Sequence, residues 1–171
     1  LAYTIKAATG SGIFSRVIVS TDSREIADVA LKYGAEVPFL RPTEYAGDHS
    51  PDIEWVRHLI RNLSKDGKPD CFSILRPTSP FRQSATIRRA WQQFLSDNRA
   101  DSLRAVEKCK QHPAKMWYVD PVANRMKPVL VNPTRHKTPW HSMQYQSLPE
   151  IYSQNASLEI AWCKTTFEKS A

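Results

Sequence analysis

Residues 16–39 read RVIVSTDSREIADVALKYGAEVPF and hold a strand pattern, a helix pattern and a second strand pattern in that order. Residues 16–20 are a short β-branched apolar run, which is typical of a strand buried on both faces of a parallel sheet. Asp22 is placed to cap a helix that ends at Gly34, and residues 35–39 form the next extended run. Two strands and a helix joined this closely predict a βαβ unit whose helix packs on a parallel sheet.

The same alternation continues along most of the chain. Helix patterns cover residues 1–8, 51–63 and 84–96, and short strand patterns cover residues 71–75, 102–106 and 158–162. Residues 112–150 are rich in Pro, Asn, His and aromatic residues and lack helical periodicity. We therefore expect one α/β domain over residues 1–171 with a mainly parallel sheet, and an extension at 112–150 outside that sheet.

Length and composition favour one soluble globular unit. The 171 residues suffice for one domain with a hydrophobic core, and 41% hydrophobic with 24% charged residues is near the average for soluble folded proteins. We find no run of about 18 apolar residues that suggests a membrane span, and no secretory leader. The three cysteines have no C-x-x-C spacing, so we assign them no metal or redox role and expect a cytoplasmic protein.

The net charge of +7 raises the question of nucleic-acid binding. The basic residues are scattered, however, and no helix-turn-helix or RNA-binding signature accompanies the densest groups, Arg88-Arg89 and Lys108 to Lys110. A polyanionic small substrate, such as a nucleoside triphosphate or an acidic sugar, explains a positive pocket equally well. We therefore expect no nucleic-acid partner and no membrane partner.

Three loops follow directly from predicted strand ends. They carry Thr21-Asp22, Arg41-Pro42 and the segment RPTSPFR at residues 76–82. Because parallel strands place such loops at one edge of the sheet, we expect Arg41, Arg76 and Arg82 to converge on one anionic ligand. The last loop also offers Thr78, Ser79 and two stiffening prolines near a helix start, which suits a nucleotide; a rigid strand-to-helix turn is the alternative.

Four motifs carry a family resemblance. They are VIVSTD (17–22), RPTEYAGD (41–48), ILRPTSPFR (74–82) and QNASLEIAW (154–162). In order and spacing they resemble the acylneuraminate cytidylyltransferases, which make CMP derivatives of sialic acid and related nonulosonic acids. The resemblance implies a three-layer Rossmann-like nucleotidyltransferase fold, here truncated at both ends. It also implies a magnesium-dependent homodimer, with the extension at 112–150 near the sugar site and the dimer contact.

In the implied reaction, the anomeric hydroxyl of the acidic nine-carbon sugar attacks the α-phosphorus of CTP and pyrophosphate leaves. The enzyme then acts by positioning and charge stabilisation. The nucleotide-binding residues implied by the resemblance are Arg41, Asp48, Ser50, Asp52, Thr78 and Ser79, and the sugar-binding ones are Arg76, Arg82, Gln144 and Asn155. No catalytic residue is assigned, and a solvated loop residue is the alternative for Gln144.

The sequence departs from the family pattern at two places. Arg76 stands where the family commonly has Gln, and an arginine can pair with a carboxylate bidentately where an amide cannot. Asn155-Ala156 replaces the usual Asn-Gly, so the backbone there loses some freedom to adopt a positive φ. The first departure leaves the identity of the sugar open.

Two family elements are expected outside this sequence: a triphosphate-gripping loop before Leu1 and an Asp-x-Asp magnesium site after Ala171. We therefore assign no metal ligand and expect residues 1–171 alone to be inactive. Alternatives are a related enzyme such as a 3-deoxy-manno-octulosonate cytidylyltransferase, and a non-catalytic nucleotide or sugar binder. A metal site at His112, His136 and His141 is disfavoured, because their spacing matches no common ligand pattern.

Overall fold

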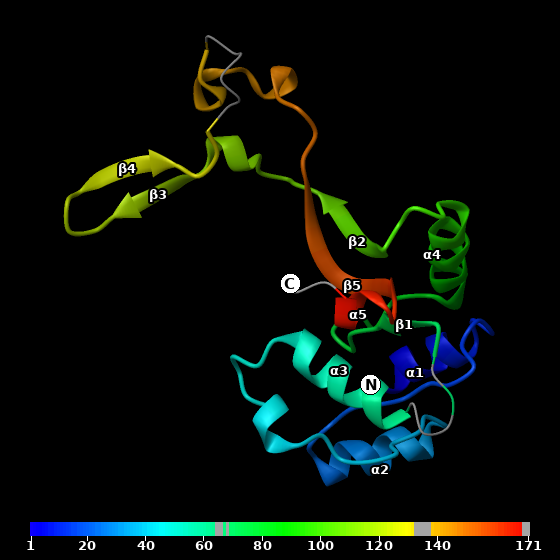
Figure 1. Cartoon of the computed structure of the whole chain (residues 1–171). Coiled ribbons are helices and arrows are strands. Elements are labelled where there is room, and N and C mark those ends of the chain that lie inside the picture. The colour runs from blue at the N-terminus through cyan, green and yellow to red at the C-terminus, as the bar shows by residue number, and fades with distance from the viewer. Residues whose placement is uncertain (64–66, 68, 132–137, 169–171) are drawn as a thin grey trace. The chain divides into compact units, whose positions relative to one another are not determined.

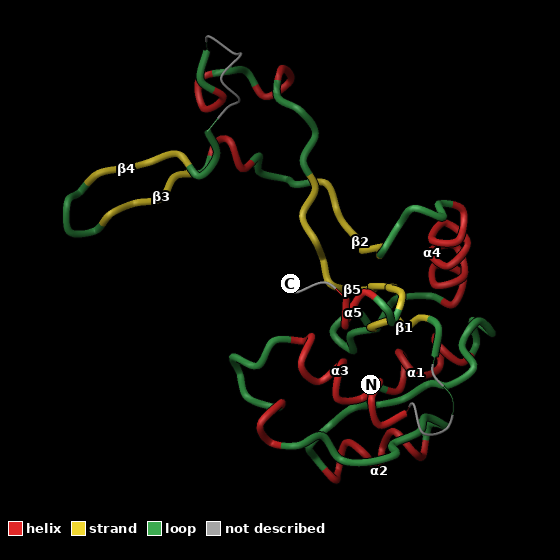
Figure 2. Tube along the Cα trace, in the orientation of Figure 1, coloured by secondary structure: helices red, strands yellow, loops and turns green. Residues whose placement is uncertain are grey.

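The computed structural model describes residues 1–63, 67, 69–131 and 138–168 (Figure 1), and it is a mixed α/β structure (Figure 2). The helices in these residues are α1 (Ala2–Thr9), α2 (Arg24–Lys32), α3 (Asp52–Leu63), α4 (Ser84–Ser96) and α5 (Thr165–Glu168). The strands are β1 (Cys71–Ile74), β2 (Ser102–Lys108), β3 (Trp117–Asp120), β4 (Arg125–Pro128) and β5 (Tyr152–Trp162). Within the described part of the chain, no helix combines the length and the apolar character needed to cross a bilayer.

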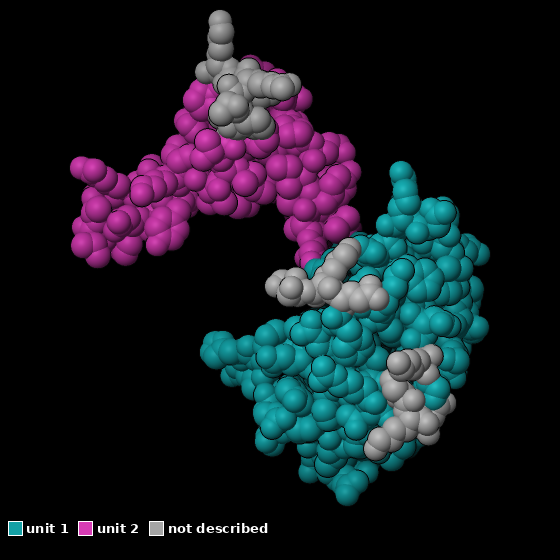
Figure 3. Space-filling model, viewed as in Figure 1, with its two compact units in different colours: residues 1–105, 156–171 teal, residues 106–155 magenta. Residues whose placement is uncertain are grey.

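The chain divides into two compact units (Figure 3). Unit 1 consists of residues 1–105 and 156–171, and unit 2 consists of residues 106–155. Because β2 and β5 each cross this division, the two units share two strands rather than a single linker. Unit 1 contains the helices α1 to α5, and unit 2 contains the hairpin of β3 and β4.

The predicted βαβ unit is present in reduced form. Its two extended segments meet at one parallel bridge, between Ile18 and Glu36, and α2 connects them. The Glu36 N–H donates to the Val17 carbonyl at 2.8 Å, and the Val19 N–H donates to the Glu36 carbonyl at 2.9 Å. The sequence had predicted strands at residues 16–20 and 35–39, and this prediction was wrong, because outside the bridge neither segment is a strand.

The ends of α2 follow the capping rules, with one correction. The N-cap is Ser23 and not Asp22, because the Ser23 hydroxyl accepts the Ile26 N–H at 3.2 Å. The predicted end at Gly34 is confirmed, since this glycine has a φ of 85°, a left-handed conformation that glycine adopts without strain.

The main sheet corrects the expectation of mainly parallel pairing. Its strand order is β1-β5-β2, and β1 pairs antiparallel with β5 from Cys71 opposite Trp162 to Ile74 opposite Glu159. Among the residues described, a parallel pairing is found at the bridge between Ile18 and Glu36. A short apolar run shows that a strand is buried, but it does not specify the direction of the neighbouring strand.

Helices cover both faces of the β1–β5 pair. On one face, Leu158 and Ile160 of β5 pack with Ile87 and Phe94 of α4, which are 0% and 1% exposed, and with Ala7 of α1. On the other face, Phe72 and Ile74 of β1 contact Val56 and Ile60 of α3 and the buried Cys163. The alternation of side chains along each strand therefore separates two apolar clusters. Leu95 of α4 lies outside this packing and is 50% exposed.

Unit 2 is built on an antiparallel hairpin and short 3-10 turns. Trp117 lies opposite Pro128 and Asp120 lies opposite Arg125, and Asn124, with a φ of 49°, belongs to the turn between the strands. The buried His112 uses both ring nitrogens inside the unit: Nδ1 accepts the Ala114 N–H at 3.0 Å and Nε2 lies 2.9 Å from the Pro149 carbonyl. His112 therefore has a structural role.

Ala156 adopts a left-handed backbone conformation. This is the position at which Asn155-Ala156 replaces the usual Asn-Gly. It lies inside β5 and has a φ of 54°. A residue with a Cβ pays roughly 1–2 kcal/mol for this conformation, whereas glycine does not. A glycine at this position, as in the usual Asn-Gly, would adopt the same conformation without this cost.

We predict that Ala156→Gly raises the free energy of unfolding by about 0.5–1 kcal/mol, because it removes the Cβ clash at positive φ. Urea denaturation measures the change. Ala161→Gly, in the regular ladder opposite Phe72, is the matched control and should lower the free energy of unfolding by about 0.5–1 kcal/mol. Equal destabilisation by both variants would contradict this account of Ala156.

Candidate functional site

Arg41 joins the loops that follow the first two extended segments. Its backbone N–H donates to the Thr21 carbonyl at 2.7 Å. Its guanidinium donates to the Ser20 hydroxyl at 3.1 Å and to the Ser20 carbonyl at 2.7 Å. The two loops are thus held together, as expected for loops at neighbouring strand ends. Burial lowers the pKa of Arg41, and the Asp22 and Asp52 carboxylates oppose this shift; the side chain remains a cation.

Trp55 supports Arg41 from α3. The Arg41 guanidinium carbon lies 4.8 Å from the centre of the Trp55 ring, which is a cation–π distance. The Trp55 indole N–H donates to Asp52 Oδ1 at 3.0 Å, and this bond fixes the ring. The first turn of α3 therefore positions an arginine of a different loop.

Asp52 also connects this arrangement to the loop after β1. Its second carboxylate oxygen, Oδ2, forms an ion pair with a terminal nitrogen of Arg76. Arg41, Asp52, Trp55 and Arg76 are called the arginine cluster below. The cluster brings together the three loops that the sequence predicted to converge, through contacts between side chains from residues 20 to 76 of unit 1.

Arg82 was also predicted to join this convergence, and its guanidinium turns instead to protein carbonyls. It donates to the carbonyl of Ser157 in β5, to the carbonyl of Arg76 at 3.2 Å and to the Thr4 hydroxyl at 3.4 Å. Burial lowers the pKa of Arg82, and its Nε atom is buried without a hydrogen-bond partner among the described atoms. These contacts favour positioning of the loop over direct contact with a sugar.

The remaining predicted nucleotide residues lie on turns. Thr78 is exposed, and Ser79 forms part of a tight turn in which its N–H donates to the Arg76 carbonyl at 3.3 Å. Asp48 is exposed, and the Ser50 hydroxyl donates to the Glu44 carbonyl at 3.3 Å. The contacts that define the arginine cluster involve none of these four residues.

The two remaining sugar-side residues belong to unit 2. Gln144 precedes a 3-10 turn at Tyr145–Ser147, and Asn155 lies in the exposed part of β5. Both residues therefore belong to a different unit from the arginine cluster.

The described residues do not offer a metal centre. They contain no group of three or more His, Cys, Asp or Glu side chains placed to hold a metal ion. Asp52 is paired with Arg76, and Asp22 lies close enough to Arg41 to affect its pKa, so these carboxylates face cations already. His141 packs on Trp117 with ring centres 4.9 Å apart, and His136 lies outside the described residues. Magnesium does not fit this set of donors.

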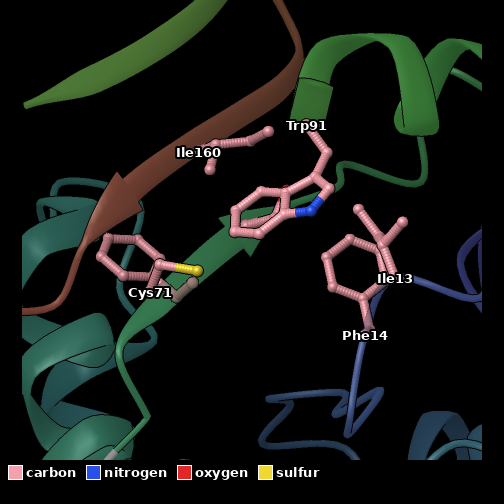
Figure 4. A pocket seen from close by; sticks show the side chains of 7 residues that line it. Ile13, Phe14, Cys71, Trp91 and Ile160 are labelled. Atoms are coloured by element: carbon pink, nitrogen blue, oxygen red, sulfur yellow. The ribbon is translucent and has the colours of Figure 1, made fainter. Parts of the chain in front are cut away.

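A small pocket lies on the α4 face of the sheet (Figure 4). Its lining is mostly apolar and consists of Ile13, Phe14, Cys71, Phe72, Ser73, Trp91 and Ile160. None of the predicted site residues lines it. An apolar lining of this kind suits core packing and does not suit a triphosphate.

Sequence reasoning missed Trp55 and Ser20. Trp55 is partly buried against the cluster of Val56, Ile60 and Cys163, so its place in the sequence pattern of α3 does not separate it from a core residue. Ser20 acts partly through its backbone carbonyl, which no side-chain pattern marks.

A family model described as cytidylyltransferase matches residues 1–159. The chain is similar to CMP-N,N'-diacetyllegionaminic acid synthase of Legionella pneumophila, with 34% identity over 172 residues that cover 100% of this chain and 70% of that protein. It is similar to N-acylneuraminate cytidylyltransferase of Escherichia coli, with 45% identity over 87 residues, or 51% of this chain and 20% of that protein. A pseudaminic acid cytidylyltransferase of Campylobacter jejuni is 33% identical over 98 residues, or 57% of this chain and 42% of that protein.

We predict that Arg82→Met lowers the free energy of unfolding by about 2 kcal/mol, because it removes the guanidinium that donates to the carbonyls of Arg76 and Ser157. Urea denaturation is again the measurement. Arg89→Met, at an exposed position of α4, removes the same charge and should change stability by less than about 0.5 kcal/mol. Equal stability of the two variants would contradict the role of Arg82 in positioning the loop.

Proposed function

The chain belongs to the cytidylyltransferase family, and we propose that it transfers CMP from CTP to the anomeric hydroxyl of a nonulosonic acid. Relatives named for legionaminic, acylneuraminic and pseudaminic acids support this class of sugar. The single observation that carries the proposal in the structure is the arginine cluster, in which Arg41 and Arg76 from two loops are held together through Trp55 and Asp52.

In the proposed reaction, the anomeric hydroxyl oxygen attacks the α-phosphorus of CTP, and the bond from that phosphorus to the bridging oxygen of pyrophosphate breaks. The hydroxyl releases its proton to solvent water, and pyrophosphate leaves with the bonding electrons. Negative charge builds up on the phosphoryl and leaving oxygens, so a fixed cation lowers the barrier. Arg41 is suited to this role, because Ser20 and Trp55 already fix its planar guanidinium.

The predicted site residues divide by substrate in this proposal. Arg41, Asp48, Ser50, Thr78 and Ser79 are proposed for the CTP side, and Arg76, Gln144 and Asn155 for the sugar side. Asp52, predicted for the CTP side, is proposed instead to position Arg76 and Trp55. Arg82 is proposed to hold the loop between them, on the evidence of its bonds to Ser157 and Arg76. Magnesium is proposed as the cofactor because it would neutralise triphosphate charge when bound, and the described residues are not proposed as its ligands.

The finer fold assignment, a three-layer Rossmann-like nucleotidyltransferase fold, is part of the same proposal. The parallel bridge at Ile18, the crossover helix α2 and the helices on both faces of β1 and β5 support it. Family membership supports it as well.

We predict that the full-length protein binds CTP in preference to UTP, ATP and GTP in calorimetric titrations with magnesium. Arg41→Leu should weaken CTP binding by about ten- to a hundredfold, because charged hydrogen bonds contribute about 1.5–3 kcal/mol. Arg89→Leu, on the exposed side of α4, is the control with the same loss of charge. Tighter binding of a purine nucleotide, or equal effects of the two variants, would contradict the proposal.

We propose further that the protein is a homodimer that uses the hairpin of unit 2. The register places Trp117, Val119, Met126 and Pro128 on one face of β3 and β4, and Tyr118, Asp120, Arg125 and Lys127 on the other. Val119 and Met126 are 54% and 62% exposed. A two-stranded hairpin is marginally stable by itself, so an uncovered apolar face favours a second copy as its cover.

We predict that Val119→Lys weakens the dimer by at least about tenfold, because it places a charge on the apolar face. Light scattering across a dilution series measures the dissociation constant. Tyr118→Lys introduces the same charge on the opposite face and should leave the dimer intact. A monomeric native protein, or equal weakening by both variants, would rule out this interface.

A further inference from the structure

The ion pair of Asp52 and Arg76 is not explained by stability. The two side chains are 43% and 35% exposed, and ion pairs at this exposure contribute little to folding. The pair nevertheless joins the start of α3 to the loop after β1. Its position at the arginine cluster is therefore better explained by binding than by folding.

The charge balance of the pair argues against the triphosphate as the ligand of Arg76. Asp52 and Arg76 together are neutral, and a multiply charged triphosphate at this point would be repelled by Asp52. A single carboxylate meets a weaker repulsion and can form two parallel hydrogen bonds to one edge of a guanidinium. The ion pair of Arg76 with Asp52 uses one terminal nitrogen, while a guanidinium has five N–H donors.

The backbone of Arg76 is fixed as well. Its carbonyl accepts from the Arg82 guanidinium and from the Ser79 N–H at 3.3 Å. A side chain that is held at its tip by Asp52 and at its backbone by Arg82 loses little further freedom when it binds a ligand.

We propose that Arg76, positioned by Asp52, is the specificity-determining residue that recognises the carboxylate of the acidic sugar. This inference rests on the proposed function and names the group of the substrate that this position reads. Glutamine at the same position offers an amide without charge, so the arginine should make this enzyme more dependent on the sugar carboxylate.

The test compares an acid with its methyl ester, which removes the carboxylate charge and little else. The full-length protein is assayed for CMP-sugar formation with N-acylneuraminic, diacetyllegionaminic or pseudaminic acid, whichever it uses best, and with the ester of that acid. Arg76→Gln should lower kcat/KM for the acid by about ten- to a hundredfold, leave the KM for CTP within about threefold, and reduce the preference for acid over ester by the same factor. Arg76→Lys, which keeps the charge without the fork, should retain part of the preference.

The controls distinguish a failure of the role of Arg76 from a failure of the proposed function. Arg89→Gln, at an exposed position of α4, should change none of these values. An unchanged preference for acid over ester in Arg76→Gln, with an active native enzyme, overturns the role of Arg76 and leaves the proposed function standing. A native enzyme that forms no CMP-sugar from any of the three acids overturns the proposed function, and the role of Arg76 falls with it.

Discussion

The guanidinium of Arg82 joins three segments of unit 1 that are far apart in the chain. Its acceptors Thr4 in α1 and Ser157 in β5 are 78 and 75 residues away, and the third acceptor is the carbonyl of Arg76. Arginine alone among the side chains has five donors in a fixed plane, so one residue can satisfy all three acceptors. The loop after β1 is held against the sheet by this side chain, and the position of Arg76 depends on it.

The arginine cluster is built on that fixed loop. Asp52 at the start of α3 receives Arg76 on one oxygen and the Trp55 indole on the other, and Trp55 supports Arg41. Arg41 in turn is bonded to Ser20 and Thr21 at the end of the first extended segment. The contacts of Arg41 and of Arg76 each cross from one segment of the chain to another, so the cations of separate loops are held in one cluster. A surface of this kind suits a substrate with phosphate and carboxylate groups, as proposed for this member of the cytidylyltransferase family.

The arginine cluster combines two cations with one carboxylate, and this combination affects how selectively it binds anions. A row of unpaired arginines would repel itself and would bind any anion, whereas a carboxylate between two arginines fixes their geometry and makes binding selective. Unit 1 holds the charged cluster, and unit 2 exposes an apolar hairpin face. The same chain thereby carries a surface suited to anions and a surface suited to another protein.

The sequence by itself determined α1 to α4, the strands β1 and β2, the C-terminal part of β5 and the loops that carry Arg41 and Arg76, because periodicity and capping are local. Residues 16–20 and 35–39 match a strand pattern as well, yet they form one bridge and no strand. The helix pattern at residues 84–96 coincides with α4, and Gly34 ends α2 as predicted. Only the tertiary structure decided that β5 runs antiparallel to β1, that Ser23 rather than Asp22 caps α2, and that Arg82 turns inward to carbonyls. A strand pattern does not encode the direction of its neighbour, and the partner of a long charged side chain depends on which distant segments lie within its reach.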